Sequence, residues 1–394
     1  MTPLHEINSC EVCGNINIKP VLNLGLHPLC DDLIKIGDAR ICNEYPIEIL
    51  FCDECITAHQ RYPVQKTLLF PEDYHYRARV TGSVLSGMRD LVDGCIKRYG
   101  DLRGKLVLDI GCNDGSLLNI FHEKGCRTVG IEPTGAADDV DNAHTTIKGF
   151  FDSRTAVSFS NVFGHADIIT FTNVFAHIGD LPALLQNLQT IMSQDTILII
   201  ENHYLGEILN RGQFDTFYHE HPRTYSFKSF LKIAETLERN LVDVEFVSRY
   251  GGNLRVHITS HGKRCPVPDE SSFLGKFALL ENNMKSWQIR VRKIILEHVA
   301  KYGPMPAKAF PGRAAILVKL LGLDETHISA VYEIKGSIKT GHYVPGTRIP
   351  ILEERALYQK STNESILNLA WHIPTEVRDN LRSNQYYGEI IDIR

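Results

Sequence analysis

The sequence predicts an α/β protein in which a doubly wound parallel sheet follows a small, metal-stapled front. The length of 394 residues exceeds one ordinary domain and suggests two or three. Two cysteine pairs stand near the N-terminus, and residues 102–134 have the order strand, glycine turn, helix, strand. Hydrophobic residues make up 43% and charged residues 23%, as in ordinary globular proteins.

Charge and patterning narrow the class of protein. A formal net charge of -5 argues against a dedicated nucleic-acid or membrane-surface protein. No stretch approaches the roughly 20 apolar residues that a membrane helix needs. The start, "MTPLHEINSCEVCG", lacks a basic head followed by an apolar run, so we expect no secretory signal and a cytoplasmic location.

The four cysteines at the front predict a structural zinc ion. Cys10 and Cys13 form "CEVC", and Cys52 and Cys55 form "CDEC". Two residues between cysteines let both thiolates reach one ion, and four thiolates leave no open position for catalysis. The alternative is unligated thiols or a redox pair. Cys30 and Cys42 lie singly between the pairs, and we expect them to be free thiols. His59 is the one nearby histidine that could replace a cysteine ligand.

A glycine-rich turn in the middle of the chain predicts a nucleotide-type site. Leu106 to Ile110 is a short apolar run, as expected for a buried parallel strand. Gly111 and Gly115 follow it and let the backbone turn sharply and approach a ligand closely. Asn113 stands where a dinucleotide fold would have its middle glycine.

Asp109 and the shape D-x-G-x-x-x-G favour S-adenosylmethionine over NAD at this turn, and a second acidic residue suits the ribose of either ligand. Glu132 ends the next strand, where it can accept hydrogen bonds from both ribose hydroxyls. Asp109 precedes the turn and suits a ligand that carries an amino-acid group rather than a pyrophosphate. We also expect Asn173, within the further strand "ADIITFTNVFAHI", to contact this cofactor. The helix "DLPALLQNLQTIM" and the strand "TILIIENHYL" continue the alternation, and a doubly wound fold without cofactor is the alternative.

The stretch "FDTFYHEHPRTYSF", residues 214–227, concentrates histidine, glutamate and aromatic side chains. His219 and His221 are two residues apart, so they diverge on a helix and share a face on a strand. This spacing differs from that of HExxH metal sites, and we favour proton transfer over metal binding. A polar turn packed by its aromatic residues is the structural alternative.

At this point the sequence resembles the sugar C-methyltransferase family, which makes branched deoxysugars on nucleotide carriers. The resemblance runs almost end to end and rests on the four-cysteine front, "LDIGCNDGSLL" with "GIEP", "NVFAHIGDL", "YHEH", "YGGNLRVHI", "VYEIKGSIKTGHYVPGTRIPI" and "LAWHI". It implies a class I Rossmann-like methyltransferase domain between a small zinc domain and a C-terminal Rossmann-like α/β domain. The apolar runs "AAILVKLL" and "ISAVYEI" agree with the last of these.

The resemblance also implies the catalytic residues, which fall on Tyr76, His177, Tyr218, Glu220 and His221. Of these, His221 suits the role of general base because imidazole titrates near neutral pH. The tyrosines would donate hydrogen bonds to an enolate oxygen, and Glu220 would orient a partner or accept a proton.

Two departures from the family pattern bear on the substrate. Arg77 to Arg79 replace the small hydroxyl residues expected after Tyr76, and "FPGRAAILVKLL" stands where the family often has a basic residue and glycine. "YGGNLRVHI" is either a tight turn before a strand or a place where Asn253 and Arg255 face a sugar or phosphate.

We therefore expect a zinc-binding domain at 1–72, an S-adenosylmethionine-binding domain at 73–205, a catalytic segment and connector at 206–285, and a nucleotide-sugar-binding domain at 286–394. The expected reaction moves methyl from S-adenosylmethionine to carbon 3 of a nucleotide-linked 4-keto-deoxysugar. The alternatives are O- or N-methylation of a nucleotide sugar and a non-catalytic zinc-knuckle adaptor. We expect the keto-sugar to be the binding partner, and we expect no nucleic-acid or membrane partner. The protein is expected to be a monomer, with a dimer as the alternative. Surface polysaccharide or antibiotic sugar assembly is the setting that the resemblance implies.

Overall fold

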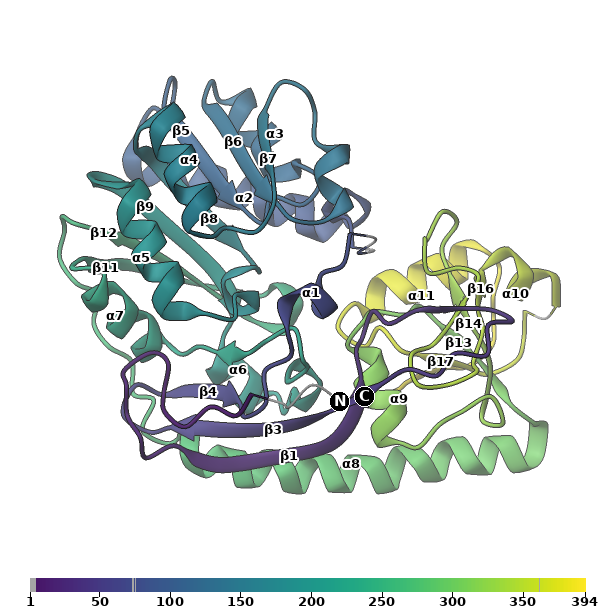
Figure 1. Cartoon of the computed structure of the whole chain (residues 1–394). Coiled ribbons are helices and arrows are strands. Elements are labelled where there is room, and N and C mark those ends of the chain that lie inside the picture. Colours follow the sequence, from purple (N-terminus) through teal and green to yellow (C-terminus); the bar gives the residue numbers. More distant parts are fainter. Residues whose placement is uncertain (1–4, 73, 75, 361) are drawn as a thin grey trace. The chain divides into compact units, whose positions relative to one another are not determined.

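The structure, a computed structural model, describes residues 5–72, 74, 76–360 and 362–394 (Figure 1). The chain divides into two compact units. Unit 1 contains the residues up to Pro20 together with Leu50–Arg211 and Glu220–Leu274. Unit 2 contains Val21–Ile49, Gly212–His219 and Gly275–Arg394. Each unit has its own parallel sheet, and each is described by itself.

A seven-stranded sheet in the order β11-β12-β9-β8-β5-β6-β7 is the centre of unit 1. The strands β5 to β9 are parallel, whereas β12 is antiparallel to both of its neighbours. The chain moves outward from β5 first to one side and then to the other, which makes β5 and β8 the point where the strand order reverses. The bounds are β5 Leu106–Ile110, β6 Arg127–Glu132, β7 Thr145–Lys148, β8 Ala166–Thr172, β9 Met192–His203, β11 Asn240–Val247 and β12 Asn253–Thr259.

Helices cover both faces of this sheet (Figure 1). Side chains of α2 and α3 pack on one face in a core that includes Leu91, Phe121 and Ile199, and α4 and α5 pack against each other. The helix starts follow local chemistry, since the side chains of Asp152 and Ser226 cap α4 and α7 through capping boxes. The bounds are α1 Lys66–Leu69, α2 Gly82–Tyr99, α3 Ser116–Glu123, α4 Ser153–Phe163, α5 Leu181–Ile191, α6 Leu205–Asn210 and α7 Phe227–Thr236.

A four-stranded sheet, in the order β1-β3-β4-β10, contains the strands next to the cysteine pairs. The bounds are β1 Lys19–Pro28, β3 Glu44–Cys52, β4 Thr57–Gln60 and β10 Arg223–Thr224. The boundary between the units falls inside β1 and inside β3. Within unit 1, β4 and β10 pair antiparallel, with Arg223 opposite His59.

Unit 2 is built on a five-stranded parallel sheet in the order β16-β14-β13-β17-β18. Its core includes Tyr332, Leu357, Leu381 and Tyr386. The bounds are β13 Met305–Lys308, β14 Ile328–Glu333, β16 Ile351–Glu353, β17 Ile366–Asn368, β18 Ile390–Asp392, α8 Phe273–Tyr302, α9 Ala314–Leu320, α10 Arg355–Lys360 and α11 Pro374–Ser383, with β2 Ile34–Lys35 pairing antiparallel to β15 His342–Tyr343.

A buried carboxylate holds residues 212–219 within unit 2. Asp215 has no exposed side-chain surface and accepts hydrogen bonds from Arg313 (2.8 Å), Trp371 (2.9 Å) and Arg394 (3.1 Å). Both guanidinium groups also lie over the Trp371 ring, at 4.9 and 4.4 Å from its centroid. Burial alone would raise the pKa of Asp215, but the two arginines hold it below its usual value.

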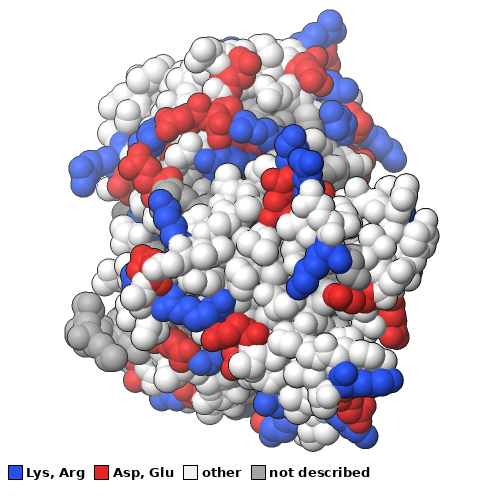
Figure 2. Space-filling view, turned by 90° about the vertical axis from the view of Figure 1, so that its right-hand side faces the viewer, with Lys and Arg blue, Asp and Glu red and all other residues white. Residues whose placement is uncertain are grey.

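The structure confirms the fold expected from the sequence. The run Leu106–Ile110 is a strand buried along its whole length, and Arg127–Glu132 is the strand that ends in the predicted acidic residue. In unit 2, "AAILVKLL" forms α9 and "ISAVYEI" forms β14. Among the described residues, no helix combines the length and the apolar character that crossing a membrane requires. On the face shown in Figure 2, acidic and basic side chains are interspersed.

Replacing Asp215 with asparagine should destabilise unit 2, because the Asp215→Asn variant leaves two buried arginines without their carboxylate. Removing one partner of a buried ion pair typically costs about 3–5 kcal/mol. Chemical denaturation followed by tryptophan fluorescence measures the change, since Trp371 lies in the cluster. Asp195→Asn, at an exposed position, is the matched control and should behave as the wild type. Equal stabilities of both variants would contradict this role of Asp215.

Candidate active site

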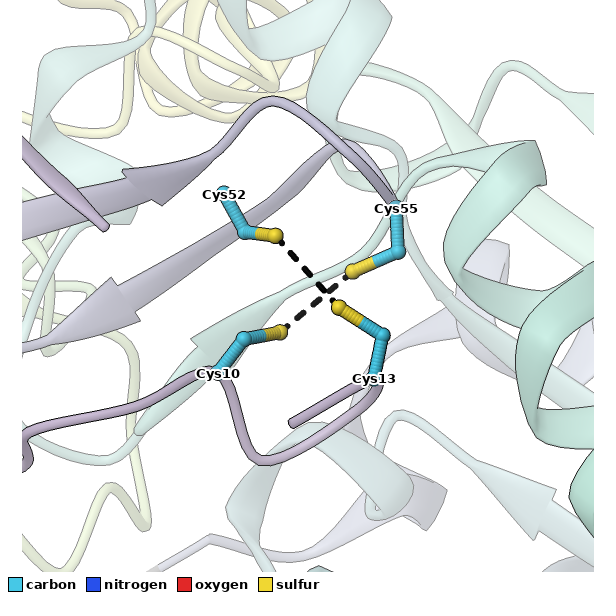
Figure 3. A group of neighbouring side chains, drawn as sticks. All are labelled: Cys10, Cys13, Cys52 and Cys55. Carbon is cyan, nitrogen blue, oxygen red and sulfur yellow. Dashed lines mark hydrogen bonds between the residues drawn. The ribbon is translucent and has the colours of Figure 1, made fainter. Parts of the chain in front are cut away.

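The four predicted zinc ligands converge in unit 1 (Figure 3). The sulfur atoms of Cys10, Cys13, Cys52 and Cys55 all lie within 4.8 Å of one another. The sulfur atoms of Cys10 and Cys55 are 3.4 Å apart, and those of Cys13 and Cys52 are 3.5 Å apart. Four sulfurs at about 2.3 Å from a tetrahedral ion would be about 3.8 Å apart, so the cluster fits zinc.

Local turns and one amide support this cluster. The amide of Gly14, in the left-handed region at φ 79°, donates to the Cys10 carbonyl, as a tight turn between two ligands requires. The side-chain amide of Asn15 donates to the sulfur of Cys52 at 3.7 Å, which favours a thiolate there. His59 is not a ligand in this arrangement, because its ring lies 3.7 Å from the carboxylate of Glu11.

The predicted cofactor turn lies at the carboxyl end of β5. Asp109, the fourth residue of the strand, is buried and accepts a hydrogen bond from the Thr170 hydroxyl at 2.7 Å. Gly111 has φ 74°, and a Cβ there would lie 2.5 Å from the Val174 side chain. Gly115 also has a positive φ and precedes α3. Both glycines are therefore required by the backbone that turns toward a ligand.

Two buried carboxyl groups, those of Asp109 and Glu132, lie at this edge of the sheet. Glu132 is 5% exposed and accepts hydrogen bonds from the backbone of Asn113 (3.0 Å) and from the backbone and hydroxyl of Thr134 (2.9 and 2.6 Å). Burial, with a smaller contribution from the charge of Glu132, raises the pKa of Asp109 to about 7. A ligand that carries positive charge on a sulfonium and an ammonium group fits two such carboxyl groups.

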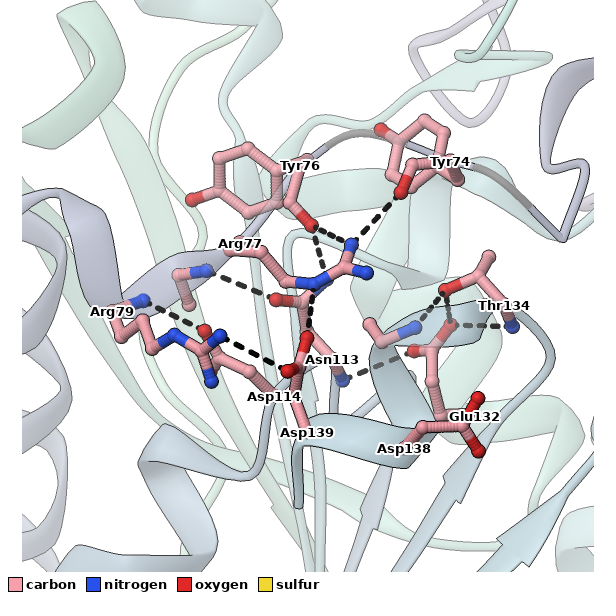
Figure 4. A network of polar contacts seen from close by, with 12 residues as sticks. Tyr74, Tyr76, Arg77, Arg79, Asn113, Asp114, Glu132, Thr134, Asp138 and Asp139 are labelled. Atoms are coloured by element: carbon pink, nitrogen blue, oxygen red, sulfur yellow. Dashed lines mark hydrogen bonds and ion pairs between the residues drawn. The ribbon is translucent and has the colours of Figure 1, made fainter. Parts of the chain in front are cut away.

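Asn113 connects the cofactor turn to the segment that carries Tyr76 (Figure 4). Its side-chain oxygen accepts from the Ala78 amide at 2.9 Å, and its nitrogen donates to the Tyr76 carbonyl at 3.1 Å. Its backbone adopts φ 51°, a conformation that asparagine tolerates. The structure thus uses the side chain of Asn113 to hold a neighbouring segment.

The same segment is held a second time by charge. Arg77 and Arg79 converge on Asp139, with nitrogen–oxygen distances of 2.6 and 3.0 Å (Figure 4). The two arginines lower the pKa of this carboxyl. They are the residues that depart from the family pattern, and they fix residues 76–79 over the helical turn at Gly135–Asp139.

Three imidazole rings, those of His177, His203 and His221, gather in unit 1. The ring centroids of His177 and His203 lie 5.0 and 5.1 Å from that of His221, which is 4% exposed. The His177 ring also stacks on Phe70 at 5.1 Å. Burial and the neighbouring His221 lower the pKa of His177 well below its ordinary value, so His177 is neutral near pH 7.

The remaining predicted residues lie at different places. Glu220 is buried and accepts a hydrogen bond from the hydroxyl of Tyr74 at 3.3 Å. Tyr76 is 40% exposed, and its carbonyl is held by Asn113. Tyr218 precedes Glu220 in the chain and belongs to unit 2, where its amide donates to the Thr216 carbonyl. His219, also in unit 2, contacts the Tyr45 carbonyl, and burial lowers its pKa to about 4.

Sequence reasoning did not single out His203 or Tyr74. His203 is the last residue of β9, and polar residues at the carboxyl ends of parallel strands are the ordinary place for functional side chains. That rule could have found it. Tyr74 comes from a segment without regular structure, and no pattern in its neighbourhood marks it.

A sheet in this strand order, with a glycine turn, paired acidic residues and a closed four-cysteine cluster, defines a zinc-carrying class I Rossmann-like methyltransferase. Three family models match in succession: a zinc binding domain at residues 10–70, a methyltransferase domain at 84–244 and a C-methyltransferase C-terminal domain at 274–391. The chain belongs to the S-adenosylmethionine-dependent C-methyltransferases built from these three parts.

Individual relatives extend this comparison. C-methyltransferase NovU of Streptomyces niveus is 28% identical over 397 residues, covering 96% of this chain and 93% of the relative. A ubiquinone biosynthesis O-methyltransferase of Actinobacillus pleuropneumoniae is 26% identical, covering 36% of this chain and 65% of its own length. The magnesium protoporphyrin IX methyltransferase of Synechocystis PCC 6803, solved with S-adenosylmethionine, aligns at 14% identity and a TM-score of 0.35, covering 45% of this chain and 79% of its own.

Loss of one zinc ligand should release the metal and destabilise the protein, because ion binding contributes folding free energy. We expect Cys52→Ser to lose most of its zinc in elemental analysis and to melt at a lower temperature. Cys265→Ser, a free and half-exposed cysteine outside the cluster, is the control and should keep both zinc and melting temperature. Full zinc content in Cys52→Ser would contradict the assignment of this ligand.

The raised pKa of Asp109 predicts a pH-dependent stability. Between an ordinary value of about 4 and about 7, the folded protein keeps a proton that the unfolded chain has released, so stability falls as pH rises through this window. Asp109→Asn removes this dependence. The wild type should lose stability relative to Asp109→Asn between about pH 5 and about pH 7, with a slope of up to about 1.4 kcal/mol per pH unit. Urea denaturation at both pH values tests this, and a constant difference would refute it.

Proposed function

We propose that this C-methyltransferase moves methyl to carbon 3 of a nucleotide-linked 4-keto-deoxysugar through an enolate. The observation that carries the proposal is the cluster of His177, His203 and His221, which places imidazole groups beside a buried candidate base. His177 follows β8, the strand next to β5 and its cofactor turn. The resemblance to sugar C-methyltransferases supports the substrate class.

Carbon methylation requires a carbanion, and a ketone at the neighbouring carbon makes one accessible. Removal of the carbon 3 proton leaves an electron pair that spreads onto the keto oxygen as an enolate. S-adenosylmethionine would supply the methyl group on a positively charged sulfur, and its thioether would be the leaving group when the enolate carbon takes the methyl. The protein has to provide a base, hydrogen-bond donors for the enolate oxygen and a fixed approach.

His221 suits the role of base because it is buried beside the rings of His177 and His203, and His177 carries no charge near pH 7. In this proposal its ring nitrogen takes the proton from carbon 3. His177 stays neutral, since burial and His221 depress its pKa, and it can therefore accept or donate a hydrogen bond without adding a competing charge. Such an arrangement leaves room for one positive charge on the cluster, the proton taken from the sugar.

Hydroxyl groups supply the donors for the enolate oxygen in this proposal. Tyr76 and Tyr218 are the predicted donors, and each can be worth about 3 kcal/mol of barrier in a site without bulk water. Glu220 accepts from the Tyr74 hydroxyl and so is suited to orient this neighbouring phenol. For the cofactor, we propose Asp109, Gly111, Asn113, Gly115, Glu132 and Asn173 as the binding residues.

We infer that unit 2 holds the nucleotide part of the substrate. The carboxyl end of β13 carries Lys308, which is 2% exposed and pairs with Glu354 at 2.6 Å. The turn that follows begins with Ala309 at φ 61° and leads past Arg313 into α9. The carboxyl end of a parallel strand, followed by a turn into a helix, is an ordinary place for a phosphate-bearing ligand.

We also propose domain limits near residues 72, 205 and 285. The enzyme is proposed to act in the cytoplasm as a monomer or dimer, without nucleic-acid or membrane partners. A reducing compartment suits four thiolates that hold an ion, and none of the ten cysteines, all of which the structure describes, forms a disulfide. Surface polysaccharide or antibiotic sugar assembly is the proposed setting.

Incubation in deuterium oxide tests the enolate. We expect the zinc-loaded enzyme to exchange the carbon 3 hydrogen of a 4-keto nucleotide sugar for deuterium, and to form a carbon-bound methyl when S-adenosylmethionine is added. Mass spectrometry follows both. In His221→Asn both reactions should fall by a factor of about 10²–10⁴, the usual contribution of a general base.

The control variant is His261→Asn, which changes an exposed histidine of the same unit and should leave both rates unchanged. Methyl transfer without exchange at carbon 3 would instead favour O- or N-methylation. Absence of both reactions with every sugar offered would favour the adaptor.

A further inference from the structure

A buried glutamate lies at the end of β9, beside the cofactor edge of the sheet. Glu201 has no exposed side-chain surface. One carboxylate oxygen accepts from Arg249 at 2.5 Å, and the other accepts from Arg255 at 2.9 Å. Arg255 also pairs with Glu245 at 2.8 Å and is itself 3% exposed. Both carboxylate oxygens thus face guanidinium groups, which can only donate, so Glu201 acts as an acceptor in this cluster.

Asn253 is oriented by this carboxylate. Its side-chain nitrogen lies 3.1 Å from the Glu201 oxygen that Arg249 contacts, and 3.0 Å from the side-chain oxygen of Asn173. Oxygen and nitrogen of an amide are distinguished by their partners. Because a carboxylate cannot donate, the atom of Asn253 that faces Glu201 must be the NH₂ group. The atom of Asn173 that faces the same NH₂ group must then be its oxygen.

Asn173 is held rigidly in this orientation. Its backbone has φ 56°, and its amide donates to the backbone carbonyl of Glu201 at 2.7 Å. The next residue, Val174, is the one that a side chain at Gly111 would strike. Asn173 therefore lies directly beside the cofactor turn, half-buried, with its NH₂ group turned away from Asn253. That NH₂ group has no hydrogen-bond partner among the described residues.

Other polar atoms at these strand ends also lack partners among the residues that the structure describes. They are buried, and they comprise the hydroxyl of Thr172, both side-chain polar atoms of Asn202 and the side-chain oxygen of Asn253. Buried polar groups in native proteins nearly always have a partner, supplied by protein, water or ligand. Polar groups of a ligand, or water, would therefore supply hydrogen bonds to these atoms at the carboxyl ends of β8 and β9.

We propose that Asn173 presents its NH₂ group to an acceptor oxygen of a bound ligand, and that Asn253 and Glu201 are positioning residues that fix this polarity. The oxygen belongs either to the carboxylate of S-adenosylmethionine or to the keto group of the sugar. Both are acceptors that a donor at this edge would recognise. The sugar case rests on the proposed function, whereas the cofactor case does not.

The geometry also decides the question that "YGGNLRVHI" raised. The guanidinium of Arg255 donates to Glu201, Glu245 and the Gly87 carbonyl, so its charge is paired inside unit 1. It does not face a sugar or phosphate. Asn253 contributes through Asn173 instead. Asn253 and Arg255, two residues apart on β12 and both buried, thus serve one chain of contacts that ends at the cofactor edge.

The decisive variant is Asn173→Asp, which keeps an oxygen toward Asn253 and replaces the outward NH₂ group by a second oxygen. We expect a loss of tenfold or more either in the affinity for S-adenosylmethionine, measured by calorimetry, or in deuterium exchange into the 4-keto sugar. Zinc content and melting temperature check that the variant folds. Asn282→Asp, at an exposed position on α8, controls for the added charge.

Asn253→Ser removes the oriented NH₂ group without burying a new charge. It should reduce the same quantity as Asn173→Asp, either the affinity for S-adenosylmethionine or the deuterium exchange, although Asn253 does not touch the ligand. Because Asn253 acts through Asn173, the double variant should lose no more than Asn173→Asp alone. A purely structural role would give additive losses and would lower the melting temperature in step.

The outcomes are separable. A loss in the calorimetric experiment identifies the cofactor carboxylate, and a loss confined to deuterium exchange identifies the keto oxygen. Affinity and exchange within twofold of the wild type in Asn173→Asp would overturn the proposal, as would additive losses in the double variant. If the wild type exchanges no sugar hydrogen at all, the proposed function fails, while calorimetry still decides whether Asn173 contacts the cofactor.

Discussion

The side chain of Arg223 has no exposed surface, and its charge has to be paired inside unit 1. Its guanidinium donates to Glu11 at 2.5 Å, to the carbonyls of Ile178 and Gly179, and to the Tyr225 hydroxyl at 2.9 Å. Glu11 follows the first zinc ligand, Ile178 follows His177, and Arg223 itself follows His221 by two residues. One buried cation therefore ties the zinc turn, the loop after β8 and the candidate base together. A structural zinc ion would thus also affect the candidate base, because the metal fixes the turn that carries Glu11, the carboxylate paired with Arg223.

The parts of the fold that the sequence predicted are those set by local chemistry. An apolar run before glycine gives β5, an acidic residue ends β6, and the paired cysteines converge on one point. The gathering of His203 and His221 depends on which strand ends meet, and they are 18 residues apart in sequence without a shared pattern. The use of residues 21–49 by unit 2 was equally hidden, because nothing in the composition between the cysteine pairs says which core those strands join.

Asn113 stands where a dinucleotide fold would have its middle glycine, and its side chain has a structural role that the glycine pattern does not predict. Glycine at that position would leave the turn free for a pyrophosphate, whereas asparagine spends both polar atoms on the backbone of residues 76–78. The arginine pair on Asp139 then closes the same segment from the other side. Together they make the position of Tyr76 depend on the cofactor turn, so occupancy of the turn and placement of this phenol are physically linked.

The segment that carries the candidate base is ordered during folding, because a buried charged residue anchors each of its ends. Asp215 is buried in unit 2 by two arginines and a tryptophan, and Arg223 is buried in unit 1 by Glu11 and two carbonyls. The seven residues between these anchors, which include Tyr218, Glu220 and His221, cannot move far at either end. Fixing a backbone residue costs about 1–2 kcal/mol, and here the cost falls on folding instead of on each catalytic cycle. A base that abstracts a proton from carbon needs that advantage more than one that acts on a hydroxyl, because the carbon proton offers no hydrogen bond to guide the imidazole into place.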